Sequence, residues 1–194
     1  MNFAASAITL AATALGNNEK CPDPSSFTVE QNFDLARYAG EWYEIQRDKN
    51  TPFEWAAECT TAHYTPRENG TDVTVVNRSW EWWTLFNYHD IHGYATCPTD
   101  EARCDVVFYN KKPEAKANYN VLTTDYDTYT VVYSCHDHFL TGKSEQLWVM
   151  GRKPTMTANQ INEIEAKVSV ILPEYDWTRG IRTTQQKCKY DWTM

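Results

Sequence analysis

The sequence predicts an all-β fold in which eight antiparallel strands are followed by one helix. Short apolar runs broken by turn residues fill the chain from Gly40 to Arg152, which is the pattern of successive strands. Val, Thr, Tyr, Phe and Trp dominate these runs, and such residues suit a pleated surface. After this region, apolar residues recur at helical spacing. The predicted strands are residues 41–47, 59–65, 73–80, 85–95, 104–109, 119–123, 129–135 and 146–151.

Short turns connect the predicted strands. Asn69-Gly70 accepts the positive φ of a tight hairpin turn, residues 98–100 mark a second turn, and residues 125–127 separate two neighbouring strands. Eight strands with such connections, and with no helix between them, form a sandwich or an up-and-down barrel. A barrel has no exposed edges, which suits strands so rich in aromatic residues.

The segment after the strands predicts one amphipathic helix. Thr157 and Gln160 form a capping box at its start, and Pro173 ends it. Because only one face of this helix is apolar, we expect it to pack outside the strands rather than inside a barrel. The apolar residues of that face are Ile161, Ile164, Val168, Ile171 and Leu172.

Length and charge favour a single acidic domain. The chain has 194 residues and a formal net charge of -8, and its longest basic run is Lys111-Lys112. Nucleic-acid-binding proteins carry basic patches, so this balance argues against nucleic acid or an anionic membrane surface as a partner. We expect one domain over residues 17–194.

Residues 1–16 predict a cleaved secretory signal. The segment has no charged side chain, is mostly apolar, and ends in Ala14-Leu15-Gly16, which fits a small-x-small cleavage site. It is too short to span a membrane comfortably, so we expect a secreted, extracellular protein. Two sequons, which begin at Asn69 and Asn77, fit glycosylation outside the cell.

The chain has six cysteines, scattered along its length. An even set without a Cys-x2-Cys pair is typical of disulfides formed in an oxidising compartment rather than of a zinc site. The spacing alone permits many connectivities and selects none of them.

Three segments resemble the signature motifs of the lipocalin family. Residues 33–43 carry its Gly-x-Trp motif at the first predicted strand, residues 124–127 resemble its second motif, and residues 148–152 resemble the third. The motifs occur in the family's order, and the resemblance covers residues 21–188. Within the family, the chain resembles the branch of apolipoprotein D, bilin-binding protein, retinol-binding protein and crustacyanin. The signature residues are Gly40, Trp42, Thr124, Asp125, Tyr126 and Arg152.

The resemblance implies an eight-stranded up-and-down barrel, the lipocalin calyx, with the helix packed outside. It implies that Trp42 closes the barrel floor and that Arg152 stacks on its ring. A guanidinium over an indole contributes about 0.5–2 kcal/mol, so both residues are expected to be structural. The implied disulfides are Cys21–Cys135 and Cys59–Cys188, with Cys97 and Cys104 left to bridge one turn.

The resemblance also places a ligand cavity inside the barrel. Alternate residues of a strand face opposite sides, and the family register points Thr130, Val132 and Ser134 inward. An eight-stranded barrel is wide enough for one small ligand. Trp148 is the strongest candidate, because an indole supplies a broad apolar wall with one hydrogen-bond donor. The ligand-binding candidates on these strands are Tyr119, Val121, Thr130, Val132, Gln146, Trp148 and Met150.

A tryptophan-rich hairpin, residues 80–88, joins the third and fourth predicted strands. In lipocalins this hairpin borders the barrel mouth, and a large exposed apolar patch usually marks a binding site or an interface. Three interpretations stay open. The hairpin is a lid over a long flat ligand, which makes Trp82 and Trp83 ligand-binding candidates, or a subunit interface of a homo-oligomer, or it packs against a neighbouring loop.

Four histidines invite a metal or haem interpretation, because imidazole is the commonest metal ligand. No cysteine or carboxylate accompanies them at ligand spacing. We therefore expect solvated loop histidines and no metal site. The four residues are His89, His92, His136 and His138.

These observations predict a carrier that catalyses nothing and requires no cofactor. Its expected ligand is a lipid, sterol or fatty acid, or a carotenoid or bilin pigment. One alternative is a lipocalin enzyme of the isomerase type, which needs an activated thiol, whereas every cysteine here has a candidate partner. We also expect no paired carboxylates at the cavity. The other alternative is a subunit of a pigmented oligomer that uses the tryptophan-rich hairpin as its contact.

Overall fold

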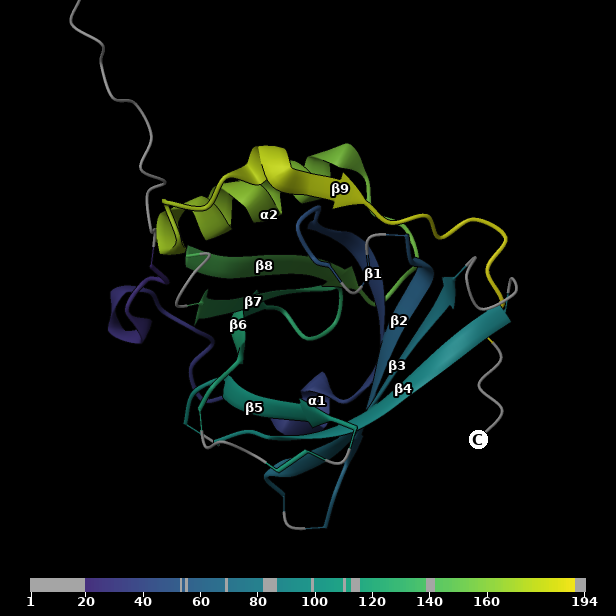
Figure 1. Cartoon of the computed structure of the whole chain (residues 1–194), viewed down its shortest axis with the longest axis horizontal. Coiled ribbons are helices and arrows are strands. Elements are labelled where there is room, and N and C mark those ends of the chain that lie inside the picture. The colour runs from purple at the N-terminus through teal and green to yellow at the C-terminus, as the bar shows by residue number, and fades with distance from the viewer. Residues whose placement is uncertain are drawn as a thin grey trace, which may run out of the picture.

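The structure is a computed structural model of the chain (Figure 1). It describes residues 20–190 apart from residues 53, 55, 69, 82–86, 99, 110, 113–115 and 139–141. The predicted signal at residues 1–16, the sequon asparagine Asn69, and Trp82 and Trp83 of the tryptophan-rich hairpin lie outside this part of the chain.

Eight antiparallel strands form a closed barrel, which confirms the predicted barrel and excludes the sandwich. The strands are β1 (Gly40–Asp48), β2 (Glu58–Pro66), β3 (Asp72–Glu81), β4 (Asn87–Thr96), β5 (Arg103–Phe108), β6 (Tyr119–Thr124), β7 (Tyr129–His138) and β8 (Gly142–Gly151). Consecutive strands are neighbours, and β1 closes the sheet because it pairs with both β2 and β8.

Strands β7 and β8 are longer than the sequence predicts. β7 continues to His138 and β8 begins at Gly142, and these two residues pair across the hairpin. The added residues are largely polar, for example Asp137 and Lys143, so apolar spacing does not reveal them.

Shorter elements surround the barrel. Strand β9 (Gly180–Arg182) pairs with the second half of β1. The short helix α1 (Leu35–Tyr38) leads into β1. Two 3-10 turns, η1 (Pro24–Ser26) and η3 (Trp177–Arg179), lie in the flanking segments. None of the described helices is long and apolar enough to span a membrane.

Helix α2 (Ala158–Ile171) packs along the outside of the barrel, as predicted (Figure 1). It begins with the expected capping box, in which Thr157 and Gln160 satisfy each other's backbone N–H groups. Its buried residues Ile161, Ile164 and Val168 pack against outward-facing apolar side chains of β7 and β8. The outer core is therefore a layer between helix and barrel, separate from the barrel interior.

Arg152 and Trp42 close one end of the barrel. Trp42 is fully buried, and the guanidinium carbon of Arg152 lies 3.7 Å from the centre of its ring. This is the arrangement that the resemblance implied for the floor. The guanidinium also donates hydrogen bonds of 2.9–3.1 Å to the carbonyl oxygens of Arg37, Tyr38, Glu41 and Tyr126.

All six cysteines form disulfides, in the pairs expected above. The first two bonds fasten the segments before β1 and after β9 to the barrel, and the third closes the β4–β5 connection. The bonds are Cys21–Cys135, Cys59–Cys188 and Cys97–Cys104.

Candidate functional site

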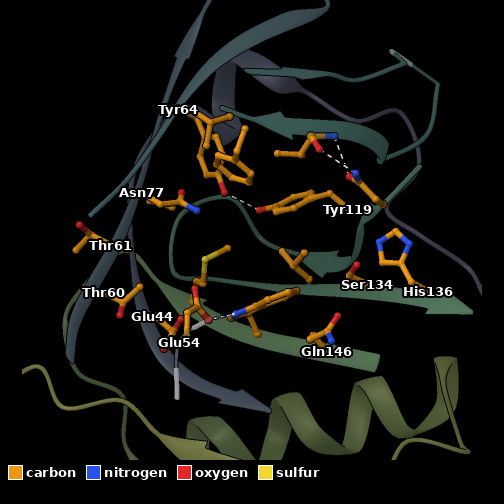
Figure 2. A pocket seen from close by; sticks show the side chains of 18 residues that line it. Glu44, Glu54, Thr60, Thr61, Tyr64, Asn77, Tyr119, Ser134, His136 and Gln146 are labelled. Atoms are coloured by element: carbon orange, nitrogen blue, oxygen red, sulfur yellow. Dashed lines mark hydrogen bonds between the residues drawn. The ribbon is translucent and has the colours of Figure 1, made fainter. Parts of the chain in front are cut away.

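The barrel contains a cavity of about 240 Å³ (Figure 2). The surface of its wall is mostly apolar, and polar side chains lie both among the apolar ones and at its ends. A mainly apolar pocket with a few placed polar groups is the usual form of a small-molecule site. The apolar wall consists chiefly of Val75, Val106, Phe108, Val132, Trp148 and Met150.

Strand alternation positions one wall of the cavity. Residues two apart on β7 and on β8 face the interior, while residues between them, such as Tyr133 and Val149, belong to the outer core under helix α2. Polar members of the inward set give this wall hydrogen-bonding groups among its apolar ones. The inward residues are Val132, Ser134 and His136 on β7 and Gln146, Trp148 and Met150 on β8.

Three tyrosine hydroxyls meet between the cavity and the barrel floor. The Tyr119 hydroxyl oxygen lies 2.9 Å from that of Tyr38 and 2.8 Å from that of Tyr64, and the Tyr64–Tyr119 bond is visible in Figure 2. Burial raises the pKa of Tyr38 to about 12 and also raises the pKa values of Tyr64 and Tyr119. This end of the cavity is therefore polar but uncharged.

Glu44 lines the opposite end of the cavity and is only 2% exposed. Its Oε1 accepts a 2.7 Å hydrogen bond from Nη1 of Arg47 and another from the hydroxyl of Thr183. Arg47 is also buried, and its Nη2 donates to the carbonyl oxygen of Ala57 at 3.0 Å. Each member of this buried ion pair is thus held by further hydrogen bonds, which such pairs need.

Glu54 reaches the same end from the β1–β2 connection (Figure 2). Its Oε2 accepts a 2.8 Å hydrogen bond from Nε1 of Trp148. Burial, and next the negative charge of Glu44, raise the pKa of Glu54 to about 8, although the Trp148 hydrogen bond and the charge of Arg47 act in the opposite direction. The Glu54 carboxyl group is therefore largely protonated at neutral pH.

The structure brings five of the predicted ligand-binding residues to the cavity wall: Tyr119, Val132, Gln146, Trp148 and Met150. Their binding of a ligand stays a prediction, as does that of Trp82 and Trp83.

Val121 and Thr130 were also ligand-binding candidates, but neither lines the cavity. Both are fully buried nearer the floor. Val121 belongs to the inner core cluster, and the Thr130 hydroxyl lies 3.3 Å from that of Tyr38. They face inward as expected, but core side chains fill the barrel at their depth.

Sequence reasoning missed several cavity residues, and the expectation of no paired carboxylates was wrong. Glu44 follows Trp42 by two residues on β1, so strand alternation was a signal that placed it inside. No such signal existed for Glu54, because it lies in a connection without a regular period. Asn118, which exchanges two 2.8 Å hydrogen bonds with the backbone of Val106, was missed for the same reason.

The histidines lie on strands, not in loops as predicted, but all four are exposed. His89 and His92 lie on β4, His136 and His138 lie near the end of β7, and His136 also lines the cavity. The described residues contain no group of three or more His, Cys, Asp or Glu side chains that could hold a metal. Asn77 of the second sequon also lines the cavity, where a glycan would occupy the interior; its glycosylation stays a prediction.

Comparison with known proteins agrees with this architecture. The profile of the Lipocalin-like domain matches residues 33–185. Apolipoprotein D of Cavia porcellus is 37% identical over 150 residues, which cover 75% of this chain and 74% of that protein. The bilin-binding protein of Pieris brassicae is 26% identical and covers 81% and 82% of the two chains.

A solved structure shows the same fold. Lobster apocrustacyanin A1 superposes with a TM-score of 0.65 at 22% identity, over 84% of this chain and 89% of that one. The closed barrel, the floor formed by Trp42 and Arg152, and the family match over most of its length establish that this chain belongs to the lipocalin family.

Proposed function

We propose that this protein is a secreted carrier that binds one small hydrophobic molecule in the barrel cavity and catalyses no reaction. The observation that carries the proposal is the mainly apolar cavity wall, with polar groups among its side chains and at its ends. A wall of this kind binds an apolar body by removing it from water, at about 25 cal/mol per Å² of buried apolar surface.

The ligand classes we propose are a lipid, sterol or fatty acid, or a carotenoid or bilin pigment. Relatives support this range, since they include apolipoprotein D and a bilin-binding protein. The predicted signal and the three disulfides support secretion, because disulfides persist in oxidising compartments. With every cysteine in a disulfide, an isomerase that depends on a free thiol has no nucleophile in this chain.

The test is a ligand titration of the purified protein followed by tryptophan fluorescence, since Trp148 lies on the cavity wall. A sterol, a long-chain fatty acid, a carotenoid and biliverdin represent the ligand classes. The pigments also report through absorption bands that shift when the pigment enters an apolar site. A saturable signal with one ligand per chain supports the carrier, and no saturable binding of any class contradicts it.

A matched pair of substitutions locates the binding site. Val132→Phe places a larger side chain into the cavity, whereas Val170→Phe makes the same change on α2, where Val170 is 83% exposed. We expect Val132→Phe to weaken binding at least about tenfold, equivalent to about 1.4 kcal/mol, and Val170→Phe to leave it unchanged. Equal affinities in the two variants would place the ligand outside the barrel.

A further inference from the structure

The acidic end of the cavity has polar atoms without partners. We define it by Glu44, Glu54 and Thr60, which Figure 2 shows gathered at one end of the cavity. Nε2 of Gln185 donates to the backbone carbonyl oxygens of both Glu44 and Thr60, at 2.9 and 2.8 Å, so these two residues are adjacent. The Trp148 indole supplies the wall beside Glu54.

The Thr60 hydroxyl is the first indication that this end of the cavity has room for the polar group of a ligand. Thr60 is only 7% exposed, and its Oγ1 has no hydrogen-bond partner. Burying a hydroxyl group without a hydrogen-bond partner lowers the free energy of unfolding by about 1–3 kcal/mol. Strand β2 has a bulge between Glu58 and Thr61, where Cys59 adopts a φ of 54°. Bulges re-aim side chains beside binding sites, and Thr60 lines the cavity.

The two carboxyl groups each keep one oxygen unused. Glu44 receives its hydrogen bonds at Oε1, and Glu54 receives its bond at Oε2. Glu44 Oε2 therefore remains as an acceptor within the described part of the chain, and Glu54 Oε1 becomes one when the Glu54 carboxyl group loses its proton. Together with the Thr60 hydroxyl oxygen, they give this end three acceptor atoms once Glu54 is ionised.

Charge at this end is balanced only while Glu54 is protonated. Arg47 is the cation that acts on Glu54, and it is already paired with Glu44. Glu44 and Glu81 both add negative charge around Glu54, from β1 and β3, and Tyr64 faces it from β2 as a neutral group. An ionised Glu54 is thus one negative charge in excess, which a buried site tolerates only when a cation neutralises it.

Resting on the carrier function proposed above, we propose that the cavity selects an amphiphile whose polar end is a protonated amine bound by Glu44, Glu54 and Thr60. An alkylammonium group has three N–H donors for the three free acceptors and supplies the missing positive charge. Its apolar body extends along Val132 and Met150 toward the tyrosine hydroxyls. A ligand with a carboxylate at this end meets repulsion instead.

The experiment compares three ligands that share one carbon chain: octylamine, octan-1-ol and octanoate, titrated at pH 7.5. We expect octylamine to bind at least about tenfold more tightly than octan-1-ol, and octanoate to bind most weakly. Glu54→Gln should remove the amine preference, so that octylamine and octan-1-ol bind this variant with affinities within about twofold of each other. Glu58→Gln is the matched control, because Glu58 is exposed at the start of β2; it should behave as the wild type.

Calorimetry on the wild-type protein gives a second readout that needs no variant. Ammonium binding lowers the pKa of Glu54, so up to about three-quarters of a proton should be released per octylamine at pH 7.5, measured from binding enthalpies in phosphate and Tris. Octan-1-ol binding without amine preference or proton release would overturn this inference and leave the carrier function standing. Failure of all three ligands to bind would also overturn this inference, whereas the carrier function falls only if the sterol, long-chain fatty acid, carotenoid and biliverdin titrations fail as well.

Discussion

The indole of Trp148 ties the β1–β2 connection to the barrel wall through its 2.8 Å hydrogen bond to Glu54. Trp148 lies on β8 and Glu54 lies 94 residues earlier. The connection also has local bonds, from the Glu54 amide to Thr51 and from the Ala57 amide to Glu54. The Trp148–Glu54 hydrogen bond therefore joins the β1–β2 connection to the adjacent cavity wall.

Replacing Trp148 with Phe should loosen this connection. The variant keeps an aromatic ring and loses the donor, so the amides of Glu54 and Ala57 should exchange with deuterium several-fold faster, because local opening becomes easier. The backbone amide of the fully buried Val131 should exchange at the wild-type rate. Hydrogen exchange followed by mass spectrometry measures both, and unchanged exchange at Glu54 would show that the bond does not hold the connection.

The Glu54 carboxyl should make stability depend on pH. Its pKa is raised to about 8 in the folded protein, from an ordinary value near 4.5, so between these values the folded state binds more protons than the unfolded state. The free energy of unfolding therefore falls as pH rises from about 5 to about 8. Glu54→Gln cannot ionise and should raise Tm by several degrees at pH 8, with a smaller difference at pH 5.

Thermal unfolding between pH 5 and 9 measures this effect. Glu58→Gln removes one exposed carboxylate from the neighbouring strand and should follow the wild-type profile. If Glu54→Gln and Glu58→Gln have parallel profiles, then Glu54 does not titrate in the range that its burial implies.

Strand period predicted which side chains face inward, but not how deep in the barrel they lie. Thr130 and Val132 share one face of β7, yet Val132 lines the cavity and Thr130 contacts Tyr38 near the floor. Depth depends on which side chains from other strands and from α1 fill the interior. A single sequence does not give these distant contacts.

The floor could be predicted, whereas the acidic end could not. Trp42 and Arg152 lie in motifs that resemble those of the family, and the structure brings them together. Glu54 lies outside every motif and strand, and its role depends on a turn that carries it back to Trp148. Of the two glutamates, only Glu44 could be placed inside the barrel from side-chain alternation along β1.

The Arg152 guanidinium should contribute strongly to stability. Arg152→Ala removes four hydrogen bonds to carbonyl oxygens and the stacking on Trp42. We expect the free energy of unfolding to fall by about 2–4 kcal/mol. Guanidinium unfolding with intact disulfides measures it. Arg182→Ala, which removes an exposed arginine with one 3.3 Å hydrogen bond, is the control. If both variants lose the same free energy of unfolding, then the contacts of Arg152 at the floor do not contribute to stability.

The Tyr119 hydroxyl should hold the tyrosine group together at the floor of the cavity. Tyr119→Phe removes the oxygen that bridges Tyr38 and Tyr64. Tyr38 keeps the Thr130 hydroxyl at 3.3 Å, whereas the buried Tyr64 hydroxyl loses its hydrogen-bond partner. Because a buried polar group without a partner is costly, the free energy of unfolding should fall by about 1–3 kcal/mol.

The same substitution at an exposed site controls for the loss of a hydroxyl alone. Tyr109 is 69% exposed, so Tyr109→Phe should change stability by less than about 0.5 kcal/mol. Tyr64→Phe combined with Tyr119→Phe should cost less than the sum of the single changes, because the double variant leaves no unpaired Tyr64 hydroxyl. Strict additivity would mean that the Tyr64–Tyr119 hydrogen bond contributes nothing, and that the two rings alone support the floor.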